Sequence, residues 1–116
     1  MKKKYMLISL LVLVVTVAVV LLLPAEKKEI EVARGTCGEN LTWVLGDAGT
    51  LTISGTGAME NYADKDDAPW YSRKDTIKTL VLENGVTSIG RNALYGCAGL
   101  TSVTIPDSVT TIGRYA

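Results

Sequence analysis

The feature that most constrains the fold of this 116-residue sequence is a 23-residue repeat between positions 77 and 116. Apolar Leu80 and Leu82 recur as Val103 and Ile105. A fixed period of 20–29 residues is typical of solenoids, in which each coil supplies a strand whose apolar face is buried only by stacking on its neighbours. The sequence therefore predicts stacked coils, each bending at a repeated glycine. The other matched pairs are Ile77 with Leu100, Val86 with Val109, Ile89 with Ile112, Gly90 with Gly113, Arg91 with Arg114 and Ala93 with Ala116.

The second copy, LTSVTIPDSVTTIGRYA at 100–116, resembles the BspA-type leucine-rich repeat, L-x-x-[VI]-x-I-P-x-S-V-x-x-I-G-x-x-A-F-x-x-C. The first copy keeps Cys97, but it has Leu94 where the family usually has Phe and Glu83 where the family has Pro. The resemblance implies a leucine-rich-repeat solenoid over 77–116, mainly β with short helical or 3-10 turns, of the α/β leucine-rich-repeat class. The second copy stops before its F-x-x-C, so we expect this chain to be a fragment of a longer protein.

Residues 35–76 are expected to form a β-hairpin cap in front of the repeats. Leu41, Trp43 and Leu45 alternate with polar or smaller residues, which is the pattern of a half-buried strand. The turn residues at 46–49 then separate this run from a second alternating run at 50–54. This segment also resembles the N-terminal cap of bacterial surface proteins that carry BspA-type repeats.

The segment 58–76 reads as a loop that leads into a short helix. Pro69 can occupy the first helical position, with Trp70 and Tyr71 as apolar anchors. The three aspartates between 64 and 67 suggest calcium binding, but they lack the glycine and the downstream bidentate glutamate of an EF-hand loop. A solvated acidic loop is therefore the favoured interpretation.

Residues 1–25 form an export segment, in which Lys2–Lys4 precede an apolar run from Met6 to Leu23. Positive charge stays on the cytoplasmic side, so the chain that follows is placed outside the cell. A helix over this run reaches about 27 Å, close to the thickness of a bilayer core, which favours a retained transmembrane signal anchor. A cleaved signal peptide, cut after Ala25, remains the alternative. The charged residues 26–34 are expected to be a solvated spacer.

The composition restricts the chemistry of the folded part. The sequence has no histidine, which removes the commonest general base and metal ligand. Residues 35–116 carry six basic and nine acidic side chains, a net charge near −3, and present no basic face for nucleic acid. We therefore expect no enzyme activity, no cofactor, no bound metal and no nucleic-acid partner. Export would permit a disulfide between Cys37 and Cys97, but two unpaired, buried thiols are favoured.

The function that remains is binding. Strand residues that alternate with the core positions should point outward and form a flat contact surface, although threonine is also a common strand former on solvated faces. The resemblance implies adhesion to host matrix, other bacteria or surface polymers, so we expect an exported cell-surface module that binds an extracellular protein or glycan. A structural spacer or targeting module for a downstream domain, including a cell-wall enzyme, is the alternative. The candidate ligand face comprises Thr79, Val81, Glu83, Ser102 and Thr104.

Overall fold

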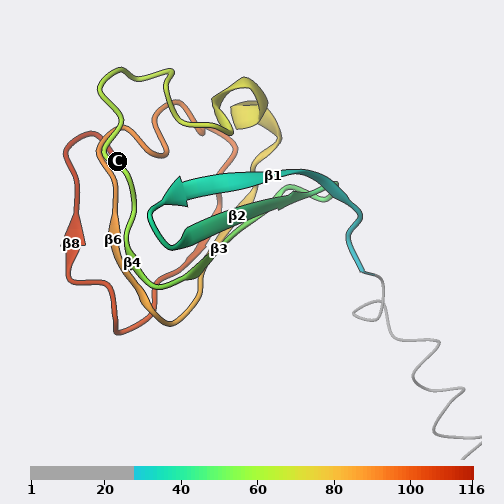
Figure 1. The fold of residues 1–116 in the computed structure, drawn as a ribbon. Helices are drawn as coiled ribbons and strands as arrows, with labels where there is room; N and C mark the ends of the chain where they lie inside the picture. The colour runs from blue at the N-terminus through green and yellow to red at the C-terminus, as the bar shows by residue number, and fades with distance from the viewer. Residues whose placement is uncertain (1–27) are drawn as a thin grey trace, which may run out of the picture.

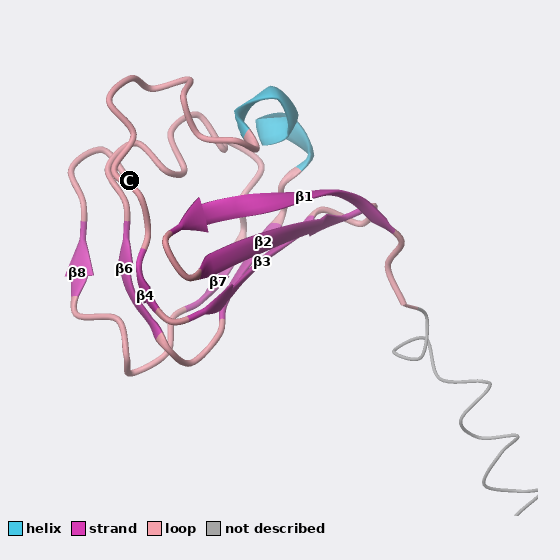
Figure 2. Cartoon of the chain, in the orientation of Figure 1, coloured by secondary structure: helices cyan, strands magenta, loops and turns pink. Residues whose placement is uncertain are grey.

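The computed structural model describes residues 28–116, which form two small sheets connected by loops and one 3-10 helix (Figure 1, Figure 2). The expected export helix in residues 1–25 lies outside the described residues. Within residues 28–116, no helix has the length and apolar character needed to cross a membrane. Apart from the 3-10 helix, the regular structure of residues 28–116 consists of β-strands, as the repeat pattern predicted.

The larger sheet combines an antiparallel cap with parallel repeat strands. Its first three strands pair antiparallel, and the third then pairs parallel with the first repeat strand. The last two strands are parallel and keep the spacing of the repeat, so that Leu80 lies opposite Val103. The strand order is β1 (Glu31–Gly38), β2 (Leu41–Gly46), β3 (Thr50–Gly55), β5 (Thr79–Leu82) and β7 (Ser102–Thr104).

The smaller sheet lies on the other side of each coil, where its strands stack side by side in Figure 2. All its strands are parallel, and Ile89 pairs with Ile112, which occupies the equivalent position of the next repeat. Each coil thus gives one strand to each sheet, which confirms the predicted solenoid. The strand order is β4 (Gly57–Ala58), β6 (Val86–Ile89) and β8 (Thr111–Ile112).

The expected spacer at 26–34 and the expected two-stranded cap are both wrong in part. Strand β1 begins at Glu31, so the last residues of the supposed spacer form part of a third cap strand. Ala33 lies opposite Leu45 and Gly35 opposite Trp43, which places these small residues over the buried face of β2. Strand β1 is stabilised because it pairs with β2 and contributes Cys37 and Ala33 to the core, which a solvated spacer would not do.

The core is centred on Trp70, which is 1% exposed and joins the cap to the repeats. Its ring packs edge-on against Trp43 at 5.6 Å and against Tyr62 at 6.1 Å between ring centres. Its Nε1 donates a hydrogen bond of 2.7 Å to the carbonyl of Ala93. The short helix expected near Pro69 is the 3-10 helix η2 (Tyr71–Thr76), which Trp70 immediately precedes.

The repeated glycines serve close approach between coils rather than a bend. A Cβ on Gly90 would collide with the carbonyl oxygen of Glu60, and one on Gly113 would lie 2.6 Å from the amide nitrogen of Arg91. The left-handed backbone occurs instead two residues later, at Asn92 with φ 57° and at Tyr115 with φ 59°. Asn92 stabilises its turn by donating a side-chain hydrogen bond of 2.9 Å to the Tyr62 carbonyl.

A serine side chain ties the second coil to the first. The hydroxyl of Ser108 donates to the carbonyl of Val86 at 2.7 Å and accepts from the N–H of Gly85 at 3.1 Å. This replaces a backbone ladder at the corner where the chain passes from one sheet to the other. The serine of the repeat motif therefore has a structural role that the sequence pattern alone did not reveal.

The two isoleucines expected to stack in the core have different environments. Ile89 is 4% exposed, as expected, whereas Ile112 is 59% exposed. Both occupy the same position of the repeat, but Ile112 belongs to the last coil in the structure, and no further coil covers it. Val103 and Ile105, which match core positions of the first copy, are exposed for the same reason.

Candidate ligand-binding face

The five predicted ligand-face residues all lie on or beside the outer face of the larger sheet. Thr79 and Val81 are half-buried in β5, where they alternate with the buried Leu80 and Leu82. Glu83 follows β5 directly, and its N–H donates to the carbonyl of Ile53. The two remaining residues, in β7, are exposed and lie opposite their counterparts in β5, with Ser102 beside Thr79 and Thr104 beside Val81.

The outer face continues into the cap, which the prediction did not include. Parallel pairing places Thr50 beside Thr79 and Thr52 beside Val81. The period-two pattern of residues 50–54 already indicated the outward side of these threonines. The repeat alignment could not connect them to β5, because the paired positions of β3 and β5 lie farther apart along the chain than one repeat. The other outward cap residues are Arg34, Thr36, Thr42, Val44 and Ser54.

Hydroxyl groups dominate this face, and few of them are used within the protein. Thr42 and Ser54 lie 3.3 Å apart across β2 and β3, and Thr50 donates a hydrogen bond of 2.7 Å to Glu29. Within residues 28–116, the hydroxyls of Ser102 and Thr104 make no hydrogen bond to another protein group. Because a hydroxyl can both donate and accept, these groups are free to contact a polar ligand.

The cap end of the face contains a shallow hollow with a volume of about 440 Å³. The hollow is lined by Arg34, Thr36, Thr42 and Val44, which supply one cation, two hydroxyls and an apolar side chain. Gly35 and Trp43, which lie opposite each other on β1 and β2, also line it. The hollow is therefore mixed in character, with one cation beside polar and apolar groups.

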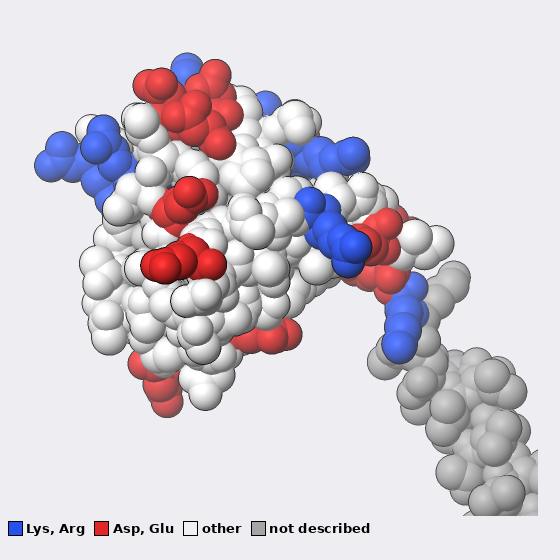
Figure 3. Space-filling model, in the orientation of Figure 1, with Lys and Arg blue, Asp and Glu red and all other residues white. Residues whose placement is uncertain are grey.

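One group of acidic side chains lies over the loop that follows β4, at the top of Figure 3. The three aspartates of the loop are exposed, and the loop is closed by its own hydrogen bonds, with the Asp64 amide donating to the Asp67 carboxylate at 3.0 Å. Among the described residues, no group of three or more His, Cys, Asp or Glu side chains is arranged to hold a metal ion. The aspartates of this loop therefore face solvent.

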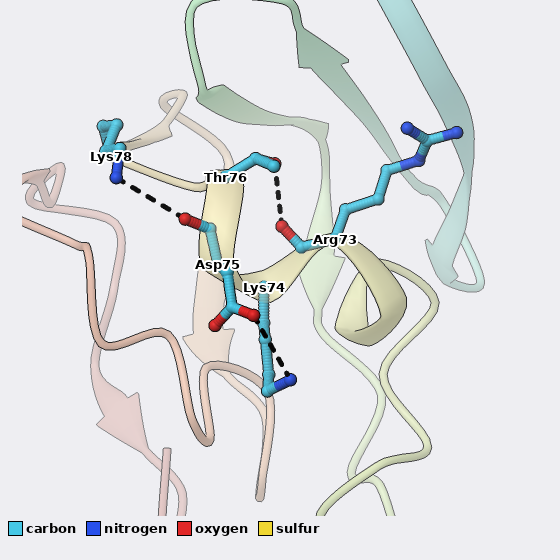
Figure 4. Close-up of polar contacts among 5 residues, drawn as sticks. All are labelled: Arg73, Lys74, Asp75, Thr76 and Lys78. Carbon is cyan, nitrogen blue, oxygen red and sulfur yellow. Dashed lines mark hydrogen bonds and ion pairs between the residues drawn. The ribbon is translucent and has the colours of Figure 1, made fainter.

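Charged residues also surround η2, where their contacts are local (Figure 4). Thr76 donates a hydrogen bond of 2.8 Å to the Arg73 carbonyl and so closes the last turn. Lys74 lies 3.9 Å from the Asp75 carboxylate and 4.7 Å from the centre of the Tyr71 ring. These groups stabilise the helix end and do not converge on a common point.

The two cysteines are unpaired, as favoured, but only Cys37 is fully buried. Burial raises the pKa of the Cys37 thiol to about 12, with a smaller contribution from Glu60. Burial also raises the pKa of the half-buried Cys97, although Lys74 opposes the change. A thiol acts as a nucleophile in its ionised form, so neither cysteine is poised for catalysis at neutral pH.

Comparison with known proteins decides the family. Residues 68–116 match the "BspA type Leucine rich repeat region (6 copies)". These residues are a BspA-type leucine-rich repeat region. The BspA-type strands are β5 to β8 of the present fold, and Trp70 and η2 also lie inside the matched stretch.

The chain also resembles two solved proteins. A leucine-rich repeat protein from Eubacterium ventriosum is 40% identical with a TM-score of 0.65, and the match covers 72% of this chain and 23% of that protein. A leucine rich cell surface protein from Faecalibacterium prausnitzii is 20% identical with a TM-score of 0.38, covering 76% of this chain and 27% of that protein. The chain thus spans about a quarter of each. No curated protein matches it.

Proposed function

We propose that this chain is the N-terminal part of an exported cell-surface binding module, which contacts a protein or glycan ligand through the outer face of its larger sheet. The observation that carries the proposal is the continuity of this face. Rows such as Thr50, Thr79 and Ser102 run in register from the cap into the repeats. A flat row of outward hydroxyls has no role in packing the core, so it is free to serve contact with a partner.

The N-terminal sequence supports the placement of this face outside the cell. The three lysines at positions 2–4 precede an apolar run that is long enough to span a bilayer. Either a retained anchor or a cleaved signal peptide would deliver residues 28–116 to the cell exterior. Protease treatment of intact cells should remove the folded part, whereas protection inside the cytoplasm would contradict export. The mass of the exported form distinguishes anchor from cleaved peptide.

The size of the face limits its affinity. Five strands spaced about 4.8 Å apart, each with two or three outward residues, give roughly 20 Å by 15 Å, or about 300 Å². A stable protein interface takes about 800 Å² from each partner. The present chain should therefore bind weakly, and each added coil should increase affinity by extending the same face.

The binding test compares variants on the two sheets. Thr104→Arg places a long cation on the proposed face, whereas Thr87→Arg makes the same change at an exposed position of the smaller sheet. Host matrix proteins and glycans should bind more weakly to Thr104→Arg than to the unchanged chain, and their binding to Thr87→Arg should not change. Equal binding by both variants would remove the larger sheet as the ligand face.

A structural spacer remains the second candidate, and the linkage between coils favours it. Backbone hydrogen bonds join successive coils at several points outside the strands, including Thr101 to Lys78 and Thr110 to Thr87. Such a ladder makes a stiff rod that could hold another domain away from the membrane. If extended chains bind no ligand at any length, the spacer is the better assignment. Neither role involves catalysis, and we expect the chain to hydrolyse no peptide or cell-wall substrate.

A further inference from the structure

The hollow at the cap end of the larger sheet is lined by Arg34, whose guanidinium the protein itself leaves largely unused. The Nε atom of Arg34 lies 3.9 Å from a carboxylate oxygen of Glu31, which is beyond hydrogen-bond distance, and the Arg34 side chain is 75% exposed. Among residues 28–116, the guanidinium makes no hydrogen bond to another protein group. Its planar fork of N–H groups can therefore hold a carboxylate in bidentate fashion.

The other groups around the hollow fit a sugar. Thr36 and Thr42 lie directly opposite each other on β1 and β2, so their hydroxyls project from the same face next to Arg34. Hydroxyls donate and accept, as sugar hydroxyls do. Val44, directly opposite Arg34 and 36% exposed, offers methyl groups for the apolar face of a sugar ring.

We propose that this hollow is a subsite for a glycan that ends in a single carboxylated sugar. The carboxylate binds the Arg34 guanidinium, and the ring lies over Val44 with its hydroxyls toward Thr36 and Thr42. The inference rests on the proposed function in one respect, which is that both place the ligand on the outer face of the larger sheet. It assigns the cap, rather than the repeats, to recognition of the acidic group.

The charges of the surrounding face favour one carboxylate over many. Glu31 lies beside Arg34, Glu29 contacts Thr50 on the same sheet, and exposed Glu83 follows β5. A polyanionic chain laid across the strands would meet these acidic groups and be repelled. A glycan with a neutral body and one acidic end brings a single carboxylate to Arg34 and keeps it away from Glu29 and Glu83.

The test uses the full 116-residue chain and two sugars that differ by the acidic unit. Binding of 3′-sialyllactose and of lactose is measured by saturation-transfer NMR titration at low salt. We expect the acidic sugar to bind at least about tenfold more tightly than lactose, since a charge-assisted contact is worth about that factor or more. Arg34→Gln should remove this preference, and Arg34→Lys should keep only part of it, because lysine supplies the charge without the fork.

Two controls make the result specific. Arg114→Gln removes an exposed cation of the last coil and should leave sugar binding unchanged. Circular dichroism and thermal melting of each variant show whether the fold is retained, which is expected because Arg34 is exposed on an edge strand. Thr104→Arg, which tests the proposed function, should not affect the acidic sugar.

Three outcomes would overturn the inference. These are equal binding of the two sugars, unchanged preference in Arg34→Gln, and equally tight binding of a short peptide with a free C-terminal carboxylate. The last would show carboxylate recognition without selection for sugar. If any of them occurs while Thr104→Arg still weakens ligand capture, the proposed function stands and only the subsite assignment fails.

Discussion

Replacing either Ile89 or Ile112 by alanine removes the same atoms from the same repeat position in two different environments. Ile89 is 4% exposed and packs in the core, so its loss combines transfer and cavity costs of about 2–4 kcal/mol. Ile112 is 59% exposed, so less than half of its burial energy is at stake and no closed cavity forms. Its loss should cost about 1 kcal/mol or less. The structure therefore predicts a difference of roughly 2 kcal/mol between the two variants.

The difference can be measured by urea or thermal unfolding followed through the fluorescence of Trp43 and Trp70, both of which are buried. For a folded part of this size, roughly 2 kcal/mol corresponds to a separation of about 8–16 °C in melting temperature. Equal destabilisation would refute the reasoning, because it would place both isoleucines in equivalent environments. In a chain extended by one coil, the cost of Ile112→Ala should rise to that of Ile89→Ala.

Three further changes test contacts that join the coils and the cap. Ser108→Ala should lower the free energy of unfolding by about 1–2 kcal/mol in a urea titration, because the Gly85 N–H loses its acceptor. The control Ser102→Ala, on the exposed face, should change it by less than about 0.5 kcal/mol in the same titration. Gly90→Ala should cost about 1–3 kcal/mol in thermal melts, because its Cβ meets the Glu60 carbonyl of the preceding coil; a wild-type melting temperature would contradict this close approach. The pKa of Cys37 is raised in the folded protein, so the unfolded chain releases the thiol proton first as pH rises. Ionisation then favours the unfolded chain, and the free energy of unfolding should decrease between pH 9 and about 12. Melting temperatures of Cys37→Ala across that range should decline less steeply, and parallel curves would exclude the linkage.

The sequence predicted those parts of the fold that depend on a regular repeat. Equivalent positions of the two copies became hydrogen-bonded pairs, such as Leu80 with Val103 and Ile89 with Ile112. The apolar anchors after Pro69 also appeared as expected, with Trp70 at the centre of the core. These predictions succeeded because burial of apolar side chains follows directly from their spacing along the strands.

The parts that the sequence did not predict depend on contacts with a neighbouring coil or strand. Strand β1 carries charge at Glu31 and Arg34 and contributes small residues to the core, so its own pattern resembles a solvated linker. The need for Gly90 arises from the Glu60 carbonyl of the preceding coil, and Ser108 bonds to backbone atoms of Val86 and Gly85 in the coil before its own. Such partners cannot be identified before the coils are stacked.

The candidate ligand face shows the same division. The repeat identified Thr79 and Ser102 as equivalent outward positions, and the structure places them side by side, although their contact with a ligand stays a prediction. The cap half of the face was missed because its strands do not follow the period of the repeats. The hollow beside Arg34 required the pairing of β1 with β2, which the sequence pattern did not indicate.

The cap changes the chemistry of the sheet as well as closing it. Strand β3 pairs with β5 in parallel, as a repeat strand would, but its other edge pairs antiparallel with β2. This reversal lets β2 turn Trp43 inward against Trp70, so that the cap covers the end of the core that a preceding coil would otherwise bury. Because the cap covers the core in this way, the outward positions of β1 and β2 need not follow the repeat pattern. Arg34 therefore places a guanidinium on the face where the repeats have hydroxyls and methyl groups. We therefore expect the cap end to be the part of the face that distinguishes a charged ligand from a neutral one.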